Sequence, residues 1–450
     1  MAHPRTLTYT ETTIPISNVK FKPDMTICQI DYPLDWYQKE FVPYAEEYQA
    51  LPDRKLATVT RWMQKYMQPA LDYFGDDLLL VAHYYMGGEI AKLTELFGGH
   101  VGDSYQLAVI AAENPQKKLI VESAVHFMAE SIAILAQPDQ KVYLTNPKAG
   151  CTMEMFAKGF MVEPAFAQLN DRYGSENILP VCYMNTSGHL KALAGAQGGA
   201  VCTSSNVAKI FKWALKQNKK IFFLPDRYMG ENVASWTGIP AEKIAYWPGG
   251  TEGAQYSLAQ QDTATLKKFD EAQLVLFASH CGVHSYFSAE MVDYWHQQNY
   301  QVIVHPECRN EVVKIADQWG STAFIWDYVI HDRAGTQKYA IGTENHMVEH
   351  LKEVCAANGI SVVNLGSAQI AGKKGMGCGC ATMARNDPPH LVALLDLLRQ
   401  GKAPEFNHVE AGDVVNEFTG QRKRLMGEDR QWLIENARKA LEKMIEITKS

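Results

Sequence analysis

In the stretch LLLVAHYY, residues 78–85, an apolar run ends abruptly in three polar ring side chains. The same pattern recurs in ILPVCYMNT (178–186) and in QVIVHPE (301–307). An apolar run without polar alternation predicts a strand buried on both faces, as in a parallel sheet. Similar runs lie at 118–122, 142–145, 221–225, 273–278 and 360–365. Because amphipathic helical segments separate these runs, the sequence predicts the α/β class.

The three strand ends mark an internal repeat. Each is followed by a hydroxyl motif: GDS (102–104), TSSN (203–206) and GST (320–322). One cysteine is the last element of each repeat: Cys151, Cys281 and Cys380. Ligands of open α/β sheets bind at the carboxyl ends of the strands. We therefore predict three similar parallel-sheet α/β domains around a pseudo-threefold axis, with the three cysteines meeting at a shared centre.

The flanks differ from the repeats, because they carry helical rather than strand patterns. We predict helical extensions at both ends of the chain. The expected division is an N-terminal extension 1–74, repeats at 75–165, 166–285 and 286–383, and a C-terminal helical segment 384–450. The polar, Gln-rich stretch 251–273 is expected to be a surface insertion in the second repeat.

The composition of the chain argues against several classes of protein. The chain has 450 residues and a net charge of -7, which argues against a nucleic-acid-binding surface. No apolar run reaches the length of about 20 residues that a membrane helix needs. The N-terminus has no apolar core of a secretory signal. We expect a cytoplasmic protein without membrane or nucleic-acid partners.

Nine cysteines in a long chain without a signal peptide make a poor disulfide framework. Local pairs of the C-x2-C type, which structural zinc sites use, are absent, and so is a dense ferredoxin-like run. Three thiols spread over three repeats suit an iron-sulfur cluster at a domain junction. Within the loop GMGCGC (375–380), Cys378 and Cys380 compete for the third ligand position.

Polar side chains at the strand ends could bind ligands and move protons. They are His83, Tyr85, Tyr183, Asn185, His284, His305 and Glu307. His305 and Glu307 alternate around one residue, so both point the same way from an extended segment. The hydroxyls of Ser104, Ser204, Ser321 and Thr322 could cap helices and hold anions. We expect the Met-x-Glu units, such as Met128 with Glu130, to be structural.

Over about residues 75–385 the sequence resembles the quinolinate synthase family. The resemblance rests on AHYY (82–85), GDS (102–104), PKAGC (147–151), YMNTS (183–187), CTSSN (202–206), FLPDR (223–227), WPGG (247–250), CGVH (281–284), HPEC (305–308), GST (320–322), IGTE (341–344) and CATM (380–383). The family's third cysteine is followed by x-x-Met, a spacing that Cys380 and Met383 meet and Cys378 does not.

The resemblance implies a transferase of NAD biosynthesis that condenses iminosuccinate (iminoaspartate) with dihydroxyacetone phosphate to quinolinate, phosphate and water. It implies one [4Fe-4S] cluster on Cys151, Cys281 and Cys380, with an open iron as Lewis acid. An L-aspartate oxidase or dehydrogenase would supply the iminosuccinate.

The resemblance also implies roles for single residues. Tyr85 and Glu307 would shuttle protons, assisted by His305. Substrate would contact the remaining matched residues: His83, Ser104, Tyr183, Asn185, Ser204, His284, Ser321 and Thr322. Two other classes are weighed against this interpretation, an iron-sulfur redox or oxygen sensor and a zinc-dependent binding protein. A sensor has no need for polar sets at three strand ends.

Overall fold

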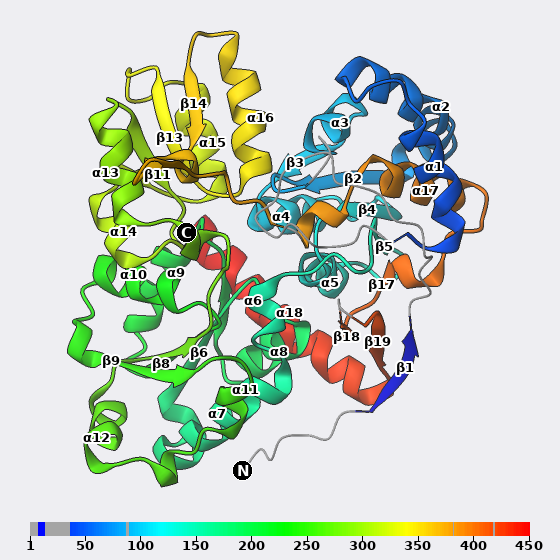
Figure 1. Ribbon diagram of the computed structural model, residues 1–450. Coiled ribbons are helices and arrows are strands. Elements are labelled where there is room, and N and C mark those ends of the chain that lie inside the picture. The colour runs from blue at the N-terminus through cyan, green and yellow to red at the C-terminus, as the bar shows by residue number, and fades with distance from the viewer. Residues whose placement is uncertain (1–7, 14–36, 87–89, 381, 417–418) are drawn as a thin grey trace.

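The chain forms three lobes, each built on its own β-sheet, in a computed structural model (Figure 1). The structure describes residues 8–13, 37–86, 90–380, 382–416 and 419–450. The predicted α/β class is confirmed, since each of the three main sheets has parallel strands with helices between them. Among the described residues, no helix combines the length and the apolar character that crossing a membrane would require.

The first sheet has the strand order β3-β2-β4-β5-β17. Its four parallel strands are β2 (Leu78–His83), β3 (His100–Gly102), β4 (Leu119–Ser123) and β5 (Lys141–Leu144). Strand β17 (His408–Val409) joins the edge antiparallel to β5. The helices of this lobe are α3 (Ile90–Leu96), α4 (Ser104–Glu113) and α5 (His126–Leu135).

The second sheet has the order β7-β6-β8-β10-β9. Its parallel strands are β6 (Ile178–Tyr183), β7 (Ala200–Cys202), β8 (Lys220–Leu224), β9 (Ile244–Pro248) and β10 (Leu274–Ala278). Two helices, α6 (Thr152–Met155) and α7 (Gly159–Tyr173), lead into it. Its further helices are α8 (Gly188–Ala196), α9 (Val207–Leu215), α10 (Arg227–Thr237), α11 (Gly250–Gln255) and α12 (Thr263–Glu271).

The third sheet has the order β12-β11-β13-β14. Its strands are β11 (Gln301–Val304), β12 (Gln318–Trp319), β13 (Lys338–Gly342) and β14 (Ser361–Asn364), all parallel. Its helices are α13 (Ala289–Gln297), α14 (Asn310–Ile315), α15 (Thr322–Ile330) and α16 (Asn345–Ala356). A short β15 (Gln369–Ile370) and β16 (Lys373–Lys374) hairpin follows.

The three sheets share one topology. In each, the second strand lies outside the first, and the third strand lies on its other side. The cysteine-bearing loop follows β5, β10 and β14, so these three strands correspond. Strand β9 is then an addition at the free edge of the second sheet, and α11 and α12 follow it within the predicted insertion 251–273. The exact domain boundaries stay a prediction.

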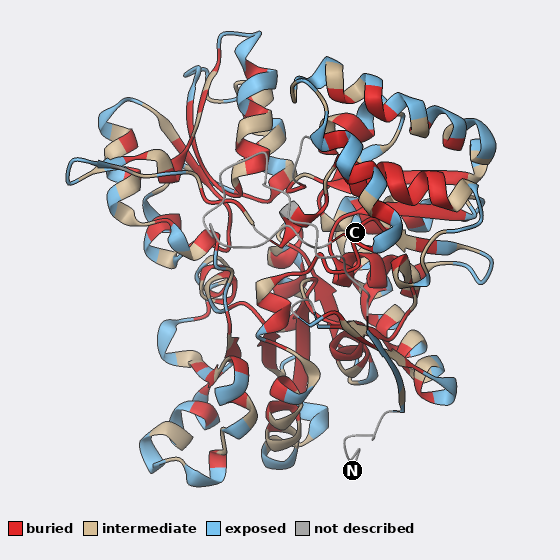
Figure 2. Cartoon of the chain, turned by 45° about the vertical axis from the view of Figure 1, so that its right-hand side comes forward, coloured by how far each residue is buried: buried red, intermediate tan, exposed pale blue. Residues whose placement is uncertain are grey.

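Both faces of the first sheet and of the third sheet are buried, as the apolar runs predict. Leu80 of β2 packs into a cluster that also contains Phe223 and Ile341, so one apolar core runs through all three sheets. Its neighbours Leu79 and Val81 point to the opposite face and a separate cluster. Figure 2 shows this buried interior, with exposed residues along the rims of the lobes. A shared core fixes the strand ends relative to one another.

The predicted helical extensions are present but also contain strands. Helices α1 (Val42–Gln49) and α2 (Leu56–Phe74) precede the first sheet, and α17 (Pro388–Arg399) and α18 (Gly427–Lys449) follow the third. The terminal segments pair in an antiparallel sheet of β1 (Tyr9–Thr13), β19 (Gln421–Leu425) and β18 (Asp413–Val415). Residues 1–7 and 14–36 of the predicted N-terminal extension lie outside the described residues.

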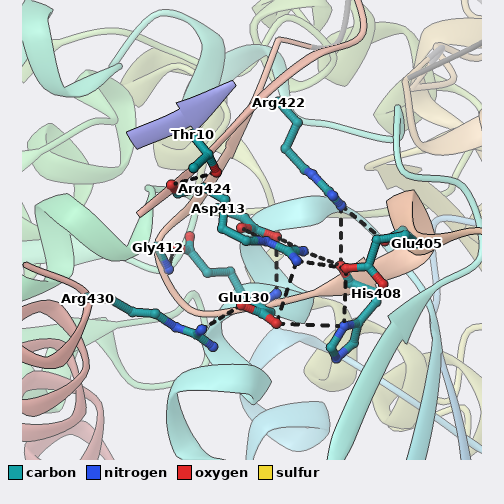
Figure 3. Close-up of polar contacts among 10 residues, drawn as sticks. Thr10, Glu130, Glu405, His408, Gly412, Asp413, Arg422, Arg424 and Arg430 are labelled. Atoms are coloured by element: carbon teal, nitrogen blue, oxygen red, sulfur yellow. Dashed lines mark hydrogen bonds and ion pairs between the residues drawn. The ribbon is translucent and has the colours of Figure 1, made fainter. Parts of the chain in front are cut away.

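The C-terminal segment contains its own ion-pair network and is joined to the first lobe through the buried carboxylate of Glu130 (Figure 3). Arg424 donates to both oxygens of Asp413, at 2.8 and 2.9 Å, and also pairs with Glu405 at 2.7 Å. The buried carboxylate of Glu130, on α5, accepts the N–H of Gly412 at 3.0 Å. Because α5 borders the central pocket described below, the C-terminal segment stabilises one wall of that pocket.

Candidate active site

One pocket lies where the carboxyl ends of the three sheets meet, and side chains from all three line it. It contains nearly all residues that the sequence predicted for the site. They are His83, Tyr85, Ser104, Cys151, Tyr183, Asn185, Ser204, Cys281, His284, His305, Glu307, Thr322 and Cys380. Among the predicted residues, Ser321 alone does not line the pocket; its hydroxyl accepts the Phe324 N–H at 3.2 Å and caps α15.

His83 and His305 occupy equivalent places, at the carboxyl ends of the first strands of the first and third sheets. The Nδ1 atom of His83 accepts the N–H of Tyr85 at 3.2 Å, and Nδ1 of His305 accepts that of Glu307 at 3.3 Å. The hydrogen of a neutral ring must then sit on Nε2. Burial lowers the pKa of each histidine to about 3, so both stay neutral. Each therefore offers an N–H donor for an oxygen of a bound ligand.

Glu307 is the charged centre of the pocket. Its Oε1 accepts from the Tyr183 hydroxyl at 2.6 Å, and its Oε2 lies 2.8 Å from His284 Nδ1. Burial alone would raise its pKa, but the neighbouring His284 and His305 and these hydrogen bonds lower it to about 2. Glu307 is therefore a carboxylate at neutral pH, held in place by two donors.

Tyr85 reaches the same network from the first sheet. Its hydroxyl lies 2.6 Å from Oγ1 of Thr343, which in turn lies 3.1 Å from His284 Nε2. Burial raises the pKa of Tyr85, and likewise that of Tyr183, well above the ordinary value. Both phenols thus stay protonated and act as donors. An unbroken hydrogen-bonded chain runs from Tyr85 to Tyr183 through Thr343, His284 and Glu307.

The hydroxyl motifs mark the N-terminal ends of three helices. Ser104 is the first residue of α4, Thr322 is the first residue of α15, and Ser204 precedes α9 by three positions. All three line the pocket, and Ser204 hydrogen-bonds Tyr183. Free N–H groups and the helix dipole make such ends favourable for anions. The pocket can therefore hold several negative groups in spite of Glu307.

The three cysteines converge on this pocket, one from the end of each sheet. Burial raises the pKa of Cys151, Cys281 and Cys380 above the ordinary thiol value; the Cys380 thiol raises it further for Cys151, and Glu307 and the Cys151 thiol raise it further for Cys281. Such thiols become thiolates only when a cation compensates the charge. Three soft ligands in one buried pocket fit an iron-sulfur cluster. Cys378 is buried but lies outside the lining, so the geometry favours Cys380.

Acidic helix caps hold two of the cysteine loops. Oε1 of Glu344, at the N-terminus of α16, accepts the Cys380 N–H at 2.9 Å. Asp226, which caps α10 at the equivalent place in the second sheet, hydrogen-bonds the backbone of Cys281. The first sheet has Val125 at this position. The two caps fix where their thiols point.

A second ligand set overlaps the pocket. Cys281, His284 and Glu307 place one ligand atom each within 4.8 Å of the others, close enough to share a single ion. However, both nitrogens of His284 already have protein partners, in Glu307 and Thr343. An ion bound there would break one of these hydrogen bonds. The three-cysteine set leaves both of these hydrogen bonds of His284 intact.

Several lining residues escaped the sequence interpretation. Glu344 and Asp103 line the pocket, although each also caps a helix. Met128 lines it too, against the expectation that its unit is only structural. Thr343 and Glu344 both belong to the IGTE motif (341–344), but the spacing of the repeats gave no reason to single out either residue.

Comparison with known proteins agrees with the resemblance. The family described as "Quinolinate synthetase A protein" matches residues 73–446. The quinolinate synthase of Geobacillus kaustophilus is 38% identical over 330 residues, which cover 73% of this chain and 83% of the relative. The quinolinate synthase of Bacillus velezensis is 35% identical over 362 residues, covering 79% and 92%. That of a Bacillus cereus strain is 33% identical over 375 residues, covering 82% and 93%.

Proposed function

Since this chain belongs to the quinolinate synthase family, we propose that it condenses iminosuccinate with dihydroxyacetone phosphate to give quinolinate, phosphate and water. This transferase reaction would serve the biosynthesis of NAD. The observation that carries the proposal is the convergence of three thiols, a buried carboxylate and three helix N-termini on one pocket.

Cys151, Cys281 and Cys380 would hold one [4Fe-4S] cluster in this pocket. Their approach from three sheets and their buried thiols support this assignment. When bound, the cluster would supply one iron without a protein ligand as a Lewis acid toward substrate nitrogen or oxygen.

The substrates suit the donors of the pocket. Iminosuccinate carries two carboxylates and dihydroxyacetone phosphate carries a phosphate, so three anionic groups must be held together. Ser104, Ser204 and Thr322 stand at three helix N-termini around the pocket, and such ends favour anions. The donors of His83, Tyr183 and Asn185 would orient the remaining substrate oxygens. Ser321 would act indirectly, because it caps the helix that begins with Thr322.

Proton transfer would depend on Glu307, Tyr85 and His305. Glu307 is ionised and could accept a proton from a substrate carbon or hydroxyl. Tyr85 stays protonated and could donate. His305 stacks on His284 with ring centroids 4.4 Å apart and would present its Nε2–H toward the reacting atoms.

Anaerobic turnover tests the proposal. Protein reconstituted with iron and sulfide would be mixed with dihydroxyacetone phosphate and freshly generated iminosuccinate, and quinolinate would be measured by chromatography. We expect quinolinate and equimolar phosphate, and neither product from apoprotein. If protein with a full cluster makes no quinolinate, the proposal fails; a redox or oxygen sensor would then be the better interpretation.

A further inference from the structure

A buried threonine hydroxyl lies against the sulfur of the third cysteine. Oγ1 of Thr382 is 3.2 Å from Sγ of Cys380, and Thr382 is buried without lining the central pocket. We propose that Thr382 is a positioning residue whose hydroxyl donates to the Cys380 thiolate and raises the reduction potential of the bound cluster. This inference rests on the proposed function, because it concerns the cluster that Cys151, Cys281 and Cys380 would hold.

The direction of this hydrogen bond follows from the charge of the ligand. In a free thiol, either partner can be the donor. A cysteine that ligates iron has lost its proton, so its sulfur can only accept. The Thr382 hydroxyl then has the one hydrogen between the two atoms and must donate it. Because the acceptor is ionised and buried, this bond is stronger than one between neutral groups.

The Thr382 hydroxyl does not fill the usual role of a threonine at such a place. Thr382 directly precedes the 3₁₀ helix Met383–Arg385, and a threonine there commonly caps the helix through its side chain. The Thr382 side chain makes no capping hydrogen bond. A buried hydroxyl needs a partner, and within the described part of the chain its partner is the Cys380 sulfur.

The chain folds around the Cys380 sulfur with further donors. The sulfur also accepts the backbone N–H groups of Thr382 and Met383. Each donor withdraws electron density from the thiolate. A reduced cluster carries one more negative charge than an oxidised one, so donors to sulfur stabilise the reduced form more and raise the reduction potential. Withdrawal of electron density would also favour the Lewis-acid chemistry proposed above.

The other two cysteines have different donors. Nδ2 of Asn185 lies 3.6 Å from the Cys151 sulfur, but Asn185 lines the pocket, where we assign it to substrate. The Cys281 sulfur accepts the backbone N–H of His284. Thr382 is therefore a side-chain donor that can be altered without removing a group from the pocket. Its effect on the cluster can be measured apart from substrate binding.

Matched variants of Thr382 test the inference by electrochemistry. Thr382→Val keeps the shape and loses the hydroxyl, whereas Thr382→Ser keeps the hydroxyl. In anaerobically reconstituted protein, we expect a more negative reduction potential in Thr382→Val and the wild-type potential in Thr382→Ser. Iron content should be equal in both, but a chelator should remove iron from Thr382→Val on the order of tenfold faster than from the wild type. Thr382→Ala replaces the valine variant if the latter does not fold.

Thr94→Val provides the control for loss of a buried threonine hydroxyl. Thr94 lies in α3 away from the pocket lining, and its Oγ1 is buried without a partner among the described residues. This variant should keep the wild-type potential.

Three results would each overturn the inference while the cluster assignment stands. They are equal potentials in the wild type and Thr382→Val, equal shifts in the serine and valine variants, and the same shift in Thr94→Val. Reconstituted wild-type protein without a cluster would overturn the cluster assignment together with the inference. Wild-type protein with a full cluster that makes no quinolinate would overturn the proposed reaction alone.

Discussion

Glu122 is a buried acid without a hydrogen-bond partner. It lies in β4, and neither carboxylate oxygen has a partner among the described residues. Burial raises its pKa from 4.5 to about 8. The folded state therefore holds this proton more tightly than the unfolded state does. The contribution of Glu122 to stability is complete below about pH 4.5 and is lost as the pH rises toward 8.

The variant Glu122→Gln should remove this pH dependence. Between pH 5 and 8 the wild-type protein should lose about 3 to 4 kcal/mol of unfolding free energy that the variant keeps. Chemical denaturation at several pH values would measure the difference. The same slope in both proteins would mean that Glu122 is solvated or paired in the folded state.

Single residues show where sequence interpretation succeeds and where it stops. His83, Tyr183 and His305 were predictable, because each follows an apolar run at the same place in a repeat. Ser321 and Thr322 are adjacent in sequence, yet only Thr322 lines the pocket. Which of two neighbours faces a pocket depends on the turn that starts the helix. Thr343 was missed because its partners lie 59 and 258 positions away along the chain.

At the scale of the element, the cap of α16 should control how firmly iron is held. In Glu344→Ala the Cys380 N–H loses its acceptor, so we expect iron to be lost to a chelator several-fold faster than from the wild-type protein. Glu344→Gln keeps an acceptor oxygen and should be less affected. Loss of the cap should also cost about 1 kcal/mol of stability.

Glu349 provides the control on the same helix. It pairs with Lys352 at the surface and does not line the central pocket. Iron loss from Glu349→Ala should match the wild-type rate when both are measured well below the unfolding temperature. Equal rates of iron loss from Glu344→Ala and Glu349→Ala would show that the cap of α16 does not affect how firmly iron is held.

Helix α18 depends on a glycine of α8. A Cβ atom on Gly195 would lie 1.9 Å from the backbone oxygen of Asn436 in α18. Helix propensity alone would favour alanine by about 1 kcal/mol. Because two backbones approach here, Gly195→Ala should instead destabilise the protein by about 1–3 kcal/mol. Thermal unfolding measures this, with the exposed neighbour Ala196→Gly as control. A more stable Gly195→Ala protein would show that the helices can separate at little cost.

Elements were predictable where the pattern is long and local. The eight apolar runs, which include 78–82, 178–184 and 301–305, match observed strands within one residue at either end. The short strands β3, β7 and β12 have only two or three residues each, too few for a periodic pattern. Strand β1 exists through pairing with β19, some 400 residues away, and no local signal could predict it.

At the scale of the whole molecule, repetition creates the site. No single sheet supplies all of Cys151, Cys281 and Cys380 or the whole hydrogen-bonded chain from Tyr85 to Tyr183, but three copies of one topology bring three strand ends together. The sequence could predict this convergence, because the cysteine closes each repeat. The contacts across the lobes could not be predicted, since they depend on how the sheets dock around a shared core.

We propose that Cys151, Cys281 and Cys380 together hold one cluster. The most direct test is the iron and sulfide content of anaerobically reconstituted wild-type protein and of four single Cys→Ala variants. We expect four iron and four sulfide per chain in the wild type and in Cys378→Ala, and loss of both in the variants of Cys151, Cys281 and Cys380. A wild-type protein that binds a single zinc ion, or a Cys380→Ala variant that keeps the cluster while Cys378→Ala loses it, would overturn this ligand assignment.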